Sequence, residues 1–103
     1  MRKVGRVDGN QEDIVSCLRK VGAVVQSLAP VGNGVPDLLV AFRGRWFVLE
    51  VKDEMQPPSK RRLTEAERVW HERFGPYAPV YVVHSRTEAL QAICCTTTGL
   101  DKN

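Results

Sequence analysis

The chain has 103 residues, 43% of them hydrophobic and 26% charged, and its formal net charge is +3. This length allows one compact core and excludes two ordinary domains, so we expect a single globular domain over residues 1–103. No apolar run approaches the roughly 20 residues of a membrane span, and residues 1–6 lack the apolar stretch of a secretory signal. The three cysteines, two of them adjacent, fit neither a disulfide framework nor a zinc site. We therefore expect a cytoplasmic protein with reduced thiols and no membrane partner.

The first expected element is an amphipathic helix that begins near residue 10, has Asn10 or Asp8 as its cap and ends at Gly22. Its apolar residues recur at helical spacing. Residues 23–28 then predict a strand, which ends in the turn-rich segment 29–34.

Two further strands, residues 37–42 and 45–52, are joined by a tight turn at Arg43 and Gly44 and form a hairpin. Both strands are almost continuously apolar. Such strands are typical of a sheet that is covered on both faces, so we expect helices to pack on each side.

The second half of the chain contains two helix starts. A capping box that begins at Thr64 predicts a helix to about Phe74, and another that begins at Ser85 predicts a helix through Ile93. Between them, residues 79–83 predict a fourth strand.

This order of elements, αβββαβα, predicts an α/β domain with a mixed four-stranded sheet flanked by helices. Residues 53–60 are expected to form a flexible connector. We also expect flexibility in the basic lead, residues 1–8, and in the tail, residues 96–103.

Three charged residues lie where the apolar hairpin strands begin or end. Side chains alternate along a strand, so Glu50 and Lys52 point to one side and Val51 to the other. The turn folds Asp37 back toward Glu50. Singly, Asp37 is typical of a turn and Glu50 with Lys52 of a surface ion pair, but together they are costly to bury without a cation. The sequence therefore predicts a site with Asp37, Glu50 and Lys52 as catalytic residues.

Two carboxylates at one place repel each other unless a cation lies between them. Mg²⁺ prefers oxygen ligands, so we expect it to be held by Asp37, Glu50 and the backbone carbonyl of Val51. Such a metal acidifies a bound water and neutralises charge on a phosphate. Lys52 would orient the nucleophile or stabilise the negative transition state. The set predicts metal-dependent hydrolysis of phosphodiesters.

The pattern Gly-Val-Pro-Asp37, then twelve residues, then Glu50-Val-Lys52 resembles the PD-(D/E)xK nuclease superfamily. The wider frame resembles its VRR-NUC branch, especially the small stand-alone versions in phages. The similarity extends from the first helix through Leu63-Thr64 and Trp70-His71 to the last strand and helix.

This resemblance implies a restriction-endonuclease-like core and a DNA endonuclease that depends on Mg²⁺ or Mn²⁺. The stand-alone members are similar to Holliday junction resolvases, which implies a homodimer that acts on branched DNA in a bacterial or phage-infected cell. A catalytically inactive nuclease-like module that only binds nucleic acid is the alternative, and RNA cleavage is a third.

The chain departs from the family pattern at two positions. Family members often carry a glutamate on the first helix that faces the metal, and the position that lines up here is Gln11, which is the expected helix ligand. A glutamine is common early in the helix after the ExK triplet, where this chain has Glu67 and Arg68.

A basic cluster of Lys60, Arg61 and Arg62 lies just beyond the predicted site. We expect it to bind the phosphate backbone of DNA, together with Arg43 and Arg45, although a solvated loop is an equal reading of the cluster.

Four aromatic residues have a less specific interpretation. His71 and His84 lack the partner spacing of a zinc site, and we expect packing or surface roles for both. Trp46 and Trp70 are expected in the core or at a dimer interface.

Overall fold

The computed structural model of the chain describes residues 9–95. The strands are β1 (Val24–Ser27), β2 (Leu38–Phe42), β3 (Arg45–Val51) and β4 (Tyr81–Val83). The helices are α1 (Gly9–Lys20), α2 (Pro58–Arg61), α3 (Glu65–Phe74) and α4 (Arg86–Leu90), with a 3₁₀ turn at Ala29–Val31 and a π-helical turn at Gln91–Cys95. The lead and tail expected to be flexible, and the Asp8 cap, lie outside the described residues.

The four strands form one mixed sheet in the order β1-β2-β3-β4. The first three are antiparallel, and β4 lies parallel to β3. The α/β class, the mixed four-stranded sheet and the order of elements are confirmed, with the short helix α2 as an addition. Among the described residues, no helix is long and apolar enough to cross a membrane.

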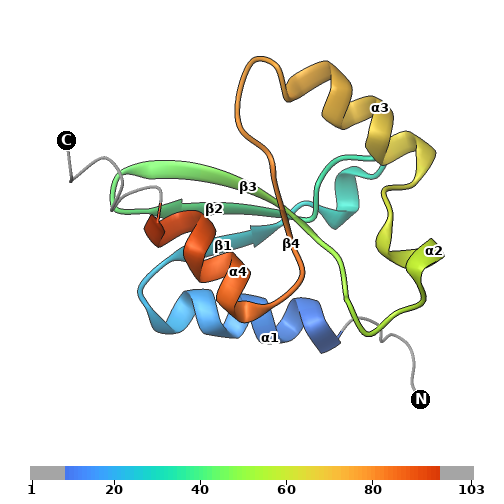
Figure 1. Cartoon of the computed structure of the whole chain (residues 1–103). Coiled ribbons are helices and arrows are strands. Elements are labelled where there is room, and N and C mark those ends of the chain that lie inside the picture. The colour runs from blue at the N-terminus through green and yellow to red at the C-terminus, as the bar shows by residue number, and fades with distance from the viewer. Residues whose placement is uncertain (1–8, 96–103) are drawn as a thin grey trace.

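The core lies between one face of the sheet and the two helices α1 and α4, which run side by side below the sheet in Figure 1. Alternate residues of β2 and β3 point into it. Its fully buried apolar side chains are Ile14, Leu18, Leu38, Val40, Leu49, Ala89 and Ile93. This packing accounts for the helical spacing in α1 and for half of the apolar residues in the hairpin.

The opposite face of the sheet is open along most of its length. Val24, Ala41 and Trp46 are cross-strand neighbours, so their side chains lie on the same side. Val24 is 70% exposed and Trp46 is 72% exposed. The expectation that helices cover both faces is therefore wrong for this part of the sheet, because only the end that carries Glu50 meets a helix, α3.

The helix caps differ in part from the expected ones. Asn10 does not cap α1; it lies inside the helix, and its side chain donates hydrogen bonds to the backbone carbonyls of Lys52 and His84. The capping box of α3 at Thr64 is confirmed. Ser85 caps α4 by accepting a hydrogen bond from the Glu88 backbone, but the Glu88 carboxylate binds the backbone N–H of His84 and leaves the box incomplete.

The segment between β3 and α3 contains a short helix that the sequence did not predict. This helix, α2 at Pro58–Arg61, begins within the expected connector over residues 53–60. Its first turn is closed by a hydrogen bond from the Lys60 N–H to the Pro57 carbonyl. Proline is favourable at a first helical position, which explains why the helix begins at Pro58.

Candidate active site

Asp37 lies at the point where β2 begins. The last pair of β2 and β3 is Leu38 with Leu49, and Asp37 and Glu50 are the next residues on the two sides of that pair. The backbone carbonyl of Asp37 accepts a hydrogen bond from Leu28 N–H at 2.8 Å, and its carboxylate Oδ2 accepts one from Val51 N–H at 2.7 Å. The Asp37 carboxylate therefore accepts a hydrogen bond from the β3 backbone just beyond the last β2–β3 pair, and this bond fixes its position.

Glu50 points to the sheet face opposite the core, yet its side chain is only 1% exposed. Burial, followed by the neighbouring Asp37 carboxylate, raises the pKa of Glu50 to about 9. The two predicted acidic residues are thus brought together, as the hairpin register required. Their mutual repulsion is the physical signature of a site that takes a proton or a cation.

Lys52 lies on the same side of β3 as Glu50, two residues further along. Its Nζ is 2.8 Å from Glu67 Oε1, and the same oxygen accepts a hydrogen bond from the Thr64 N–H. Burial opposes ionisation of Glu67, but the hydrogen bonds from Lys52 and Thr64 outweigh it and hold the pKa of Glu67 below its ordinary value. The capping box of α3 and the predicted catalytic lysine therefore share one carboxylate.

His71 also reaches this site, which the sequence did not indicate. Its Nε2 lies 3.2 Å from Glu50 Oε1, and desolvation lowers its pKa. The available signal was the helical spacing of four residues between Glu67 and His71, which places both on one face of α3. That signal has meaning only once α3 is known to lie against the end of β3.

Gly34 explains how α3 comes so close. It has a φ of +82°, and a Cβ at this position would lie 2.2 Å from the Ala66 carbonyl oxygen. The loop before β2 therefore packs directly on the first turn of α3, as Figure 1 shows for the chain leading into β2. Pro36, which is fully buried, holds the next part of this loop.

The donor set fits a hard divalent cation. Within residues 9–95, no group of three or more His, Cys, Asp and Glu side chains is arranged to hold a metal by itself. Mg²⁺ needs fewer protein ligands, because it keeps several waters and binds through one or two carboxylates plus substrate phosphate. Asp37 and Glu50 supply two such carboxylates, and the buried, strongly proton-binding Glu50 is an observation of this structure that a cation would satisfy.

The basic residues fall into two groups. Arg61 and Arg62 line a hollow of about 440 Å³ together with His84. The Asn10 side-chain amide donates hydrogen bonds to the backbone carbonyls of both His84 and Lys52, and so links this hollow to the predicted site. This group lies beside the site. Arg43 lies in the hairpin turn and Arg45 is the first residue of β3, five positions along the strand from Glu50, roughly 16 Å.

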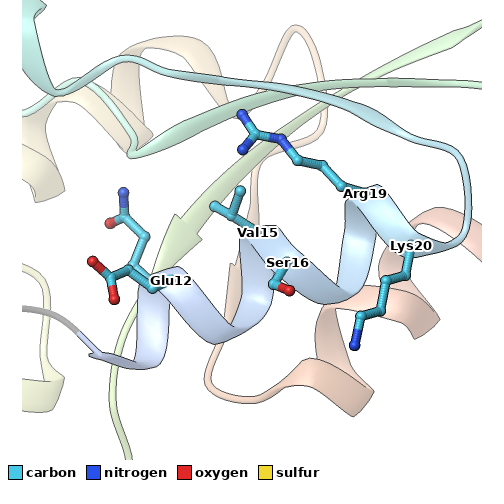
Figure 2. A pocket seen from close by; sticks show the side chains of 6 residues that line it. Glu12, Val15, Ser16, Arg19 and Lys20 are labelled. Carbon is cyan, nitrogen blue, oxygen red and sulfur yellow. The ribbon is translucent and has the colours of Figure 1, made fainter.

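Gln11, the expected helix ligand, lines a hollow of about 530 Å³ along α1. Figure 2 shows this hollow, with Glu12, Val15, Ser16, Arg19 and Lys20 around it. All of its lining residues belong to α1, whereas the contact that α1 makes with the Lys52 backbone comes from Asn10.

The mixed sheet, its flanking helices and the two carboxylates and lysine at one end of the hairpin define a restriction-endonuclease-like α/β domain. No family model and no curated protein matches the sequence. Among solved structures, a VRR-NUC domain is similar, with a TM-score of 0.61 and 32% sequence identity over 82% of this chain and 90% of that domain. The chain therefore belongs to the VRR-NUC family, and its function is of the nuclease type.

Proposed function

We propose that the protein is an endonuclease that hydrolyses phosphodiester bonds of DNA and requires Mg²⁺ or Mn²⁺. The observation that carries the proposal is the pair of facing carboxylates, Asp37 and buried Glu50, with Lys52 on the same side of β3. Family membership supports the nuclease chemistry.

In this proposal Asp37, Glu50 and the Val51 carbonyl hold the cation, which when bound lowers the pKa of a coordinated water and offsets charge on the phosphate. Asp37 acts from a fixed position, since its Oδ2 is held by the Val51 N–H. Lys52 provides a fixed positive charge for the phosphate, and Glu67 holds it ready at 2.8 Å. Lys60, Arg61 and Arg62 bind the DNA backbone next to the scissile bond.

The finer proposal is a homodimer that cuts branched DNA such as a Holliday junction. The open sheet face with Val24, Ala41 and Trp46 is a suitable surface for a second copy, because its two exposed apolar side chains lie in one cross-strand row. A two-fold dimer would present two sites to a symmetric junction.

A nuclease-like module that binds nucleic acid without cutting it is the second candidate. The observation that favours it is Gln11, an amide at the position where family members often carry an acidic ligand. RNA in place of DNA as the substrate is tested in the same way.

The test is cleavage of labelled four-way junction, flap, linear duplex DNA and single-stranded RNA in Mg²⁺, Mn²⁺ or EDTA. We expect DNA cutting that needs the metal, with paired symmetric cuts in the junction. Junction binding without cutting in any metal would favour the inactive module.

A further inference from the structure

The contact between His71 and Glu50 joins two side chains that water hardly reaches. The side chain of His71 is 14% exposed and that of Glu50 is 1% exposed, with 3.2 Å between Nε2 and Oε1. Buried polar atoms need protein partners, because their hydrogen bonds to water are otherwise not replaced. The Glu50 carboxyl is thus a buried polar partner of His71, and it also meets the carboxylates of Asp37 and Glu67.

The contact belongs to a two-point match between a helix and a strand. Glu67 and His71 are four residues apart on α3, about 6 Å between neighbouring side chains on one helix face. Glu50 lies in β3 and Lys52 directly follows this strand, two residues further along the chain, about 7 Å in extended backbone. Because these spacings agree, Glu67 meets Lys52 while His71 meets Glu50.

Two further contacts restrict His71. The first turn of α3 lies against Gly34 with no room for a Cβ, which limits how far the helix can shift along the strand. The Trp70 ring meets the His71 ring edge to face, with 6.0 Å between centroids, which confines the imidazole.

Glu50 has three side-chain torsions, and within residues 9–95 no backbone N–H holds its carboxylate in the way that the Val51 N–H holds that of Asp37. We propose that His71 is a positioning residue that holds the Glu50 carboxylate in the orientation it shares with Asp37, and thereby sets the affinity of this site for a divalent cation. The inference rests on the proposed function and adds a residue to it. Partners of this kind orient metal-binding carboxylates and contribute roughly 10- to 100-fold to metal affinity or activity.

The experiment is calorimetric titration of Mn²⁺ into metal-free wild-type protein, His71→Ala and His71→Gln, with Glu72→Ala as the matched control. Glu72 is the next residue of α3, and its carboxylate faces Arg68 on the exposed side of the helix. We expect His71→Ala to weaken Mn²⁺ binding by about tenfold or more. Glutamine places an amide N–H near the position of Nε2, so His71→Gln should recover most of the affinity, and the control should match the wild type.

Melting temperature and DNA affinity in EDTA are measured for the same proteins, and neither should separate His71→Ala from His71→Gln. Equal Mn²⁺ affinity in wild type and His71→Ala would overturn the positioning role while leaving the proposed nuclease intact. An equal loss in the alanine and glutamine variants would also overturn it, since that pattern indicates packing alone. Absence of Mn²⁺ binding by the wild type would overturn both proposals.

Discussion

Lys52 and Glu67 form an ion pair in which the Glu67 oxygen that faces Nζ at 2.8 Å also accepts a hydrogen bond from the Thr64 N–H. One carboxylate thus completes the capping box of α3 and holds the lysine proposed to act on the phosphate. The start of α3 and the end of β3 are therefore one structural unit, and changes to either should affect the site.

The close approach of Gly34 to α3 predicts a strong effect of Gly34→Ala. Gly44 provides the matched control, because its φ of +80° is nearly the same as that of Gly34 and its Cβ would meet open space. Gly44→Ala should lower the free energy of unfolding by about 1 kcal/mol, the cost of the left-handed backbone. Gly34→Ala should lower it by about 3 kcal/mol, since overpacking against Ala66 is added. Urea unfolding measures both, and equal losses would contradict the packing seen here.

The titration of Glu50 predicts how stability depends on pH without metal. Its pKa is raised from 4.5 to about 9 in the folded chain, so between these values the folded state holds a proton that the unfolded state has released. The free energy of unfolding in EDTA should therefore fall as the pH rises from about 5 to about 9. Glu50→Gln should remove most of this slope, and saturating Mg²⁺ should flatten it in the wild type. Urea midpoints at three pH values check this, and the same slope in both proteins would speak against a proton on Glu50.

The basic cluster predicts a change in the salt dependence of DNA binding. Replacing Lys60, Arg61 and Arg62 by alanine should weaken binding and reduce the slope of log K against log salt by about one for each phosphate that is no longer neutralised. Arg68→Ala is the control, because its guanidinium is already bound to Glu65 and Glu72. Fluorescence anisotropy at several salt concentrations measures the slopes. An unchanged slope would assign the cluster to a solvated loop.

The open sheet face predicts the effect of a charge at Trp46. If this face joins two copies, Trp46→Glu should yield a monomer in light scattering. The free energy of unfolding of this monomer should lie within about 0.5 kcal/mol of the free energy of unfolding of a wild-type monomer, because the substitution is on the surface. Tyr77→Glu is the control, because Tyr77 is 89% exposed and lies outside the sheet. A dimer that survives Trp46→Glu would place the interface elsewhere.

Much of the fold follows from signals that act over short distances along the chain. The hairpin is set by its turn, where Arg43 and Gly44 both adopt positive φ, and its register then brings Asp37 opposite Glu50. The capping box at Thr64 likewise depends on residues three apart. The fold class and the meeting of the two carboxylates could therefore be predicted.

The remaining features depend on how distant elements pack. Asn10 resembles a helix cap, but its amide binds carbonyls of residues that follow 42 and 74 positions later. An apolar strand indicates burial without saying what covers it, so the exposure of Trp46 could not be foreseen. His71 gained its contact with Glu50 only through the position of α3.

The central claim is that Lys52, together with a cation at Asp37 and Glu50, carries out phosphodiester hydrolysis. The most direct measurement is the rate of Mg²⁺-dependent cleavage of a four-way junction by wild type, Lys52→Ala and Asp37→Asn, with DNA affinity and Mn²⁺ affinity measured alongside. We predict that Lys52→Ala abolishes cleavage and retains DNA binding, and that Asp37→Asn loses cleavage and also binds the metal more weakly. Full activity of Lys52→Ala would contradict the account.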